Sequence, residues 1–225
     1  QRVTVLKNSD EIAEVGIALN YLAEALQTQE QLRKHLTADI AHELRTPLAT
    51  IRSHIEAFQD GVWEPTPDKL QICHDQAMQL VDLINDLGEL ATVENPMLKM
   101  DKRPLLLNQL MDEIVKSVQG LWSYKNISLQ MNIAPALIIH GDERRLKQVF
   151  VNLLINAHKY TLEGGNIIIK AMQEHSGIVI EISDTGIGIE ATELPHVFER
   201  FYRGEKSRNR KAGGSGIGLA IVKAV

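Results

Sequence analysis

His42 is the first residue in this sequence that could carry a reaction, because an acid follows it directly and a hydroxyl lies one helical turn beyond. An imidazole with an ordinary pKa of about 6.5 keeps one ring nitrogen available as a nucleophile near neutral pH. Glu43 can hold the proton on the other nitrogen, and Thr46, four residues on, shares the same helix face and can position a water near a phosphoryl group. We therefore interpret residues 42–48 as a candidate phosphoryl acceptor.

This interpretation has two alternatives, a surface histidine without a function and a zinc ligand. One histidine among eight in a charged helix is more often a surface residue than a catalytic one. A zinc site of the His-Glu-x-x-His type fails, since it needs a second histidine where Thr46 stands. The prediction for His42 consequently depends on what the rest of the chain supplies.

The segment at residues 152–160 supplies amide, ammonium and phenol groups on one helix. Asn152, Asn156, Lys159 and Tyr160 are spaced by four, three and one, so most of them share a face. Amide oxygens suit Mg²⁺, lysine suits phosphate, and tyrosine can pack beside a base. Surface asparagines are the alternative, but asparagines within an apolar run are costly if buried without partners. The pattern favours a nucleotide site.

Glycine-rich segments follow. Asp184 precedes Gly186 and Gly188 directly after a predicted strand, and its carboxylate could accept a hydrogen bond from an adenine amino group. Residues 186–191 also satisfy a dinucleotide-binding pattern, which the lack of repeated βαβ units disfavours. Residues 213–219 open the last predicted helix with glycines that suit a polyphosphate, although a flexible linker is the simpler alternative. The basic stretch 203–211 before them predicts a mobile lid over phosphates, with a plain solvated loop as the alternative.

These groups need elements to position them. Residues 1–95 are predicted to be almost wholly helical, with Pro47 bending or loosening the first helix. A break at residues 60–67 precedes a second helix with Thr66 as N-cap and Pro67 in its first turn, carrying a heptad seam. An antiparallel hairpin of this kind cannot close a core alone, so we expect two copies to pair as a dimeric four-helix bundle.

After a linker at Asn95-Pro96 the pattern changes to strands and helices, an α+β sandwich with helices on one sheet face. We expect strands at 105–107, 128–133, 137–139, 167–172 and 178–183. We also expect helices at 108–118, capped by Asn108, and from Asp142, as cap, to about 159.

Bulk properties exclude several classes. The 225 residues carry a net charge of −5, which argues against nucleic-acid binding, and a single cysteine excludes an internal disulfide framework. No apolar run approaches the length that spans a bilayer. The start without methionine and the end within a helix indicate a fragment.

Together the segments resemble the five boxes of a sensor histidine kinase of two-component signalling. Residues 42–48 resemble its H-box, 152–160 its N-box, 184–188 its G1 box, 198–203 its F-box and 214–219 its G2 box. Their order and spacing match from about residue 30 to the end. Residues 9–26 are more weakly similar to the closing helix of a HAMP linker.

The resemblance implies that His42 accepts the γ-phosphoryl group of ATP, that Glu43 assists as a base and that Thr46 aids dephosphorylation of the partner. It implies that Asn156 binds Mg²⁺ and that Asp184 reads adenine. The other nucleotide-binding residues it implies are Asn152, Lys159, Tyr160, Gly186, Gly188, Arg203, Arg208, Gly214, Gly216, Gly218 and Leu219.

It also implies a domain order. Residues 1–29 would end a HAMP helix, 30–95 would form the dimerisation and phosphotransfer hairpin, 96–102 a linker, and 103–225 a Bergerat-type ATP-binding domain without its final strand and helix. The expected partners are a second copy and the receiver domain of a response regulator, with phosphatase activity on that regulator. The expected location is the cytoplasmic portion of a bacterial cell-membrane protein.

Three other functions stay open on the sequence alone. A conformational ATPase of the gyrase, chaperone or mismatch-repair type would share the ATP fold, and the helical hairpin that carries His42 argues against it. A degenerate scaffold would only dimerise, which Asn156, Asp184 and the glycine loops disfavour. A serine/threonine kinase is disfavoured by the absence of its His-Arg-Asp and Asp-Phe-Gly segments.

Overall fold

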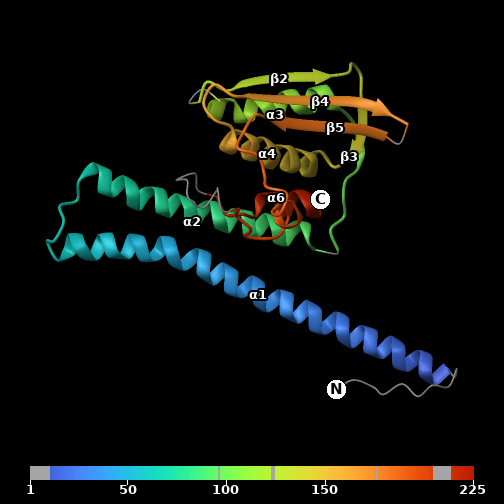
Figure 1. Ribbon diagram of the computed structural model, residues 1–225, viewed down its shortest axis with the longest axis horizontal. Helices are drawn as coiled ribbons and strands as arrows, with labels where there is room; N and C mark the ends of the chain where they lie inside the picture. Colours follow the sequence, from blue (N-terminus) through green and yellow to red (C-terminus); the bar gives the residue numbers. More distant parts are fainter. Residues whose placement is uncertain (1–10, 96, 123–124, 176, 205–213) are drawn as a thin grey trace. The chain divides into compact units, whose positions relative to one another are not determined.

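The computed structural model describes residues 11–95, 97–122, 125–175, 177–204 and 214–225 (Figure 1). The chain divides into two compact units, Gln1–Ala77 and Met78–Val225, and the boundary falls within a helix, α2. Among the described residues, no helix combines the length and the apolarity that a membrane crossing requires.

The first unit is dominated by α1 (Glu11–Gln59), which continues through Pro47 as one α-helix. Figure 1 shows that its axis changes direction along its length, as expected where a proline removes a backbone donor. Gly61, with a φ of +69°, follows the helix end, and α2 (Pro67–Val93) begins at the predicted residue. The Trp63 ring lies 5.1 Å from the His54 ring and 5.0 Å from the Lys69 Nζ atom, which ties the turn to both helices.

The second unit contains the sheets. Its elements are β1 (Arg103–Leu106), α3 (Leu107–Trp122), β2 (Ser128–Ile133), β3 (Ile138–Gly141), α4 (Glu143–Tyr160), β4 (Asn166–Glu174), β5 (Gly177–Asp184), the 3₁₀ turn η1 (Leu194–His196) and α6 (Gly218–Ala224). β1 pairs antiparallel with β3. The main sheet has the order β2-β4-β5, in which β2 and β4 are parallel and β4 and β5 form the predicted antiparallel hairpin.

The core lies between the main sheet and the helices α3 and α4, which cover one sheet face (Figure 1). In β4, Ile167, Ile169 and Ala171 are buried while the residues between them are not, so the strand follows the alternation of a sheet with one covered face. Leu107, Met111 and Leu154 are among the fully buried helix residues that pack against them. The sequence-based sandwich is therefore confirmed.

Helix caps show where local signals succeeded and failed. The Asp142 carboxylate accepts from the Arg145 amide at 3.2 Å and caps α4 as predicted. The prediction that Asn108 caps α3 is wrong, because the helix begins at Leu107 and its amide donates to the Leu137 carbonyl at 2.9 Å. The Asn108 Oδ1 atom is buried, with no hydrogen-bond partner in the described part of the chain.

Candidate functional site

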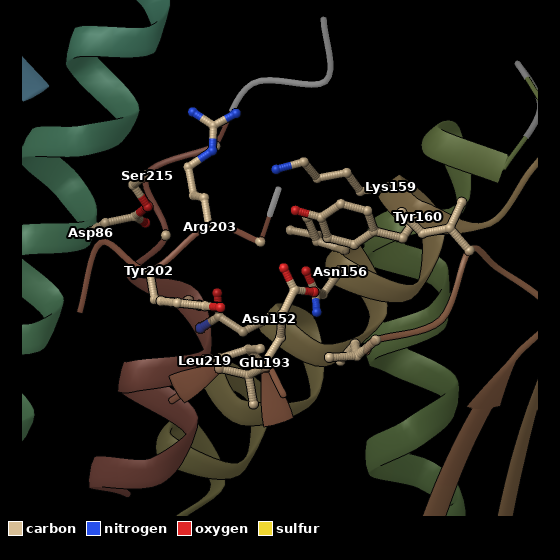
Figure 2. Close-up of a pocket in the computed structure, with 18 of the residues that line it drawn as sticks. Asp86, Asn152, Asn156, Lys159, Tyr160, Glu193, Tyr202, Arg203, Ser215 and Leu219 are labelled. Atoms are coloured by element: carbon tan, nitrogen blue, oxygen red, sulfur yellow. The ribbon is translucent and has the colours of Figure 1, made fainter. Parts of the chain in front are cut away.

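A cavity of about 510 Å³ opens in the second unit beside α4, and most of the predicted nucleotide residues line it (Figure 2). The predicted residues at its wall are Asn152, Asn156, Lys159, Tyr160, Asp184, Gly188, Arg203, Gly214, Gly216, Gly218 and Leu219. Gly186 does not line the cavity, and Arg208 lies outside the described residues. Segments from residues 152 to 219 therefore meet at one place.

Helix α4 serves the core and the cavity with different faces. Phe150, Leu154 and Ala157, spaced by four and three, are buried in the core. Asn152, Asn156 and Lys159 repeat the same spacing two residues further on and reach the cavity instead. The polar residues that interrupt this apolar run thus avoid the cost of burial without partners, because they face an open cavity.

The polar side chains of α4 point into the cavity. Figure 2 shows Asn152, Asn156, Lys159 and Tyr160 extending from α4 into the cavity, with Arg203 approaching from a different segment. The Lys159 Nζ atom lies 5.1 Å from the centre of the Tyr160 ring. The ammonium group is thereby held near the ring and available to an anion.

The Asp184 loop is fixed by its own backbone. The Asp184 Oδ1 atom accepts from the Gly186 amide at 2.8 Å, which orients the carboxylate. The Ile187 amide donates to the Tyr160 carbonyl at 3.3 Å. A Cβ atom added at Gly186 would stand 2.6 Å from that carbonyl oxygen, so only glycine permits this close approach to the end of α4.

The segment after the predicted lid also approaches α4. Gly216 has a φ of +71°, and a Cβ atom there would lie 2.8 Å from the backbone of Phe201, whose amide donates to the Gly216 carbonyl at 3.0 Å. A Cβ atom at Gly218 would stand 3.0 Å from the Asn152 Oδ1 atom. Of the predicted lid, only Arg203 and Gly204 are among the described residues.

The donor set at this cavity fits a magnesium nucleotide. The Arg203 Nε–H group is buried and has no acceptor in the described part of the chain, so an anionic ligand would satisfy it. Lys159 adds a second cation, and the Asn156 amide oxygen is the hard ligand that Mg²⁺ favours.

Sequence reasoning missed the acidic and amide residues that α2 contributes to the same cavity, namely Asp82, Asn85 and Asp86. The Ser215 hydroxyl donates to the Asp86 carboxylate, and the two side chains lie together in Figure 2. Burial raises the pKa of Asp86, and the Ser215 hydrogen bond partly offsets that rise. No sequence signal could have found these residues, because a polar helix face carries no mark of what it meets.

The predicted acceptor lies in the first unit, on α1. His42 and Thr46 are exposed and Glu43 is half-buried, so the imidazole is accessible to an incoming group. The Thr46 hydroxyl donates weakly to the His42 carbonyl at 3.5 Å, which places the two residues on one face as their spacing predicts. The chemical roles of these three residues stay predictions.

Two protein-family models match separate parts of the chain, one around the predicted acceptor and one around the cavity. Residues 32–96 match the family described as the His Kinase A phospho-acceptor domain, which contains His42. Residues 141–225 match the family described as the histidine kinase-, DNA gyrase B- and HSP90-like ATPase. This matched range includes α4 and the later segments that line the cavity. The ATPase match implies that the nucleotide is ATP.

Individual histidine kinases are also similar to this chain. The chain is 37% identical over 214 residues to the signal transduction histidine-protein kinase BaeS of Escherichia coli K12, covering 95% of this chain and 46% of BaeS. It resembles the solved Acinetobacter baumannii histidine kinase AdeS, with a TM-score of 0.65, 25% identity and coverage of 81% and 84% of the two chains.

Histidine kinase ThkA, solved in complex with the response regulator protein TrrA, shares the fold, with a TM-score of 0.69, 22% identity and coverage of 86% of this chain and 63% of that chain. The chain spans less than half the length of BaeS. With a phospho-acceptor domain followed by an ATPase domain of this kind, the chain belongs to the sensor histidine kinases.

Proposed function

We propose that this chain transfers the γ-phosphoryl group of ATP to His42 and passes it on to an aspartate of a response regulator. One observation carries the proposal: most of the predicted nucleotide residues line one cavity, in a chain that presents an exposed histidine on a helix. The phospho-acceptor and ATPase family matches cover these two parts separately.

The chemistry is a displacement at phosphorus. One ring nitrogen of His42 forms the new bond to the γ-phosphorus as the bond to the leaving oxygen of ADP breaks. Glu43 holds the proton on the other ring nitrogen and stabilises the imidazolium. Catalysis here is mainly positioning and charge neutralisation, so Lys159 and Arg203 act by holding phosphate oxygens.

We assign the nucleotide contacts by chemistry. Asp184 would accept a hydrogen bond from the adenine amino group, and Tyr160 would pack beside the base. Asn156 would hold Mg²⁺, which when bound neutralises phosphate charge. Thr46 would position the water that removes phosphate from the regulator's aspartate, giving the phosphatase activity we expect. Asn152 and the glycine segment would line the phosphate side.

A second copy of the chain is the first partner we propose. The hairpin leaves large apolar side chains exposed along α1 and α2, among them Leu22, Leu26, Leu32, Leu48, Ile55, Leu70, Val81 and Ile84. Such a row of apolar side chains is destabilising in water and is typical of helices that pair. A dimeric four-helix bundle would cover it.

The remaining proposals concern the whole protein. The second partner is a response regulator, the class of protein found with ThkA. We assign residues 1–29 to the end of a HAMP helix, 30–95 to the dimerisation and phosphotransfer hairpin, 96–102 to a linker and 103–225 to the ATP-binding domain. We place this portion in the bacterial cytoplasm, below a membrane anchor that belongs to the parent protein.

Labelling of the protein with ATP that is radioactive in its γ-phosphate tests the proposal. The wild-type chain should retain an acid-labile, alkali-stable label. His42→Gln should lose the label and keep ATP affinity, whereas Asn156→Ala should lose the label by losing Mg-ATP.

Mixing the two variants shows whether one subunit phosphorylates the other. Release of labelled phosphate without any label on the wild-type protein would instead indicate a conformational ATPase. A wild-type chain that binds no Mg-ATP would indicate a dimerising scaffold.

A further inference from the structure

Lys125 reaches across the second unit to the end of α4. It lies in the turn before β2, partly buried, and its Nζ atom donates to the carbonyls of His158 at 2.9 Å, Lys159 at 3.0 Å and Thr161 at 3.2 Å. The last carbonyls of a helix have no partner within the helix, and a cation there also complements the helix dipole. A lysine ammonium has three N–H donors, and here each has a carbonyl.

The backbone that Lys125 holds is the backbone on which the Asp184 loop rests. The Tyr160 carbonyl, which lies between the Lys159 and Thr161 carbonyls in the chain, accepts from the Ile187 amide at 3.3 Å. The same carbonyl is the atom that Gly186 approaches closely. A shift of the α4 end would therefore displace the loop that carries Asp184.

The position of the Lys125 backbone does not depend on its side chain. The Gly164 amide donates to the Lys125 carbonyl at 3.0 Å, and the Ser128 amide donates to the Gly165 carbonyl at 3.0 Å. The Asn126 side chain adds a longer contact to Glu163 at 3.4 Å. These bonds join the turn before β2 to the turn after α4, so a substitution of the Lys125 side chain leaves the turn itself in place.

We propose that Lys125, which does not line the cavity, is a positioning residue for the adenine side of the nucleotide site. Its ammonium fixes the end of α4, and through the Tyr160 carbonyl it fixes the carboxylate of Asp184. This inference rests on the proposed function, in which ATP occupies the cavity and Asp184 receives the adenine amino group. A lysine that merely capped the helix would contribute to stability and leave nucleotide recognition unchanged.

The test compares Lys125→Met with the matched control Lys116→Met, which removes an equal charge from an exposed site on α3. Binding of ATP and GTP is measured by calorimetry, and the label on His42 is measured against ATP concentration. For Lys125→Met we expect a roughly tenfold weaker ATP affinity, a smaller preference for ATP over GTP, and a higher KM with kcat within about twofold. Lys116→Met should match the wild type.

Coupling to Asp184 separates positioning from capping. In the Asp184→Asn background, Lys125→Met should cost no further ATP affinity, because the group that Lys125 positions is already lost. Lys125→Arg, which keeps the charge, should restore most of the ATP affinity and of the preference for ATP. Hydrogen exchange should be faster at the Ile187 amide in Lys125→Met and unchanged in Lys116→Met.

The outcomes distinguish failure of the positioning role of Lys125 from failure of the proposed function. If Lys125→Met lowers the melting temperature but keeps ATP affinity and the ATP preference, the lysine is only a helix cap and the inference is wrong. If Lys125→Met does not fold, Lys125→Gln, which keeps a donor, is measured in the same way and judged by the same criteria. If the wild-type chain binds no ATP, the proposed function fails and the inference falls with it.

Discussion

Replacing Gly186 by alanine tests how the structure builds the nucleotide site, because this glycine touches the end of α4 and not the cavity. The added Cβ atom would stand 2.6 Å from the Tyr160 carbonyl oxygen and 2.9 Å from its carbon, whereas ordinary contacts begin at 3.4 Å. The added Cβ atom would also stand 2.6 Å from the Asp184 Oδ1 atom, but the Tyr160 atoms are backbone and cannot swing aside as a flexible side chain can. The loop must therefore move away from α4.

The cost follows from what this movement breaks. Overpacking of this kind costs about 1–3 kcal/mol, and loss of the Ile187–Tyr160 hydrogen bond costs about 0.5–1.5 kcal/mol. We expect the free energy of unfolding of the second unit to fall by about 2–4 kcal/mol. If the displaced Asp184 carboxylate also loses the adenine amino group, about 1.5–3 kcal/mol of binding energy goes with it, which weakens ATP binding roughly 10- to 150-fold.

Chemical denaturation and calorimetric titration with Mg-ATP measure the two effects. Gly120→Ala is the matched control, since this exposed helical glycine in α3 has nothing within 4 Å of an added Cβ atom. It should stabilise the protein by about 0.5–1 kcal/mol and leave ATP affinity unchanged. If Gly186→Ala kept both wild-type stability and wild-type ATP affinity, the contact between the loop and α4 would not position Asp184.

Three further substitutions follow from the second unit. Burial raises the pKa of Asp86, so the folded unit binds more protons than the unfolded chain, and its stability falls as pH rises from the ordinary carboxyl value of about 3.9 through the raised one. Asp86→Asn should reduce this fall in denaturation curves measured from about pH 4 upward, and an unchanged pH dependence would contradict the argument. The backbone amide of Asp101, followed by that of Arg145, lowers the pKa of Asp142. The charged cap therefore stabilises the folded unit above the ordinary carboxyl pKa, and this stabilisation is lost as pH falls through the lowered pKa. Asp142→Ala should cost about 1 kcal/mol of unfolding free energy at pH 7, and a cost that persisted in strong acid would refute the charge argument. Leu154→Ala, at a fully buried core position, should cost about 2–5 kcal/mol by denaturation, whereas a loss below about 1 kcal/mol would show that the core refills.

The sequence was sufficient for features whose physical cause lies within one helical turn or one strand. Proline in the first turn of α2, the Asp142 cap of α4 and the alternation of β4 act locally, so the elements could be read from neighbouring residues. The spacing of Asn152, Asn156 and Lys159 likewise predicted a shared face. The predicted cap at Asn108 was wrong, because α3 begins one residue earlier, at Leu107. The Leu107 amide donates to a carbonyl thirty residues away, which a local pattern cannot show.

Tertiary structure decided which of these faces became a site. Packing of Phe150, Leu154 and Ala157 into the core turns the asparagine face of α4 toward the cavity, and no local pattern states which face a core will cover. The three carbonyl contacts of Lys125 join residues more than thirty positions apart. Contacts at such separation depend on how sheets and helices pack together, whereas a sequence pattern records only what a residue and its near neighbours prefer.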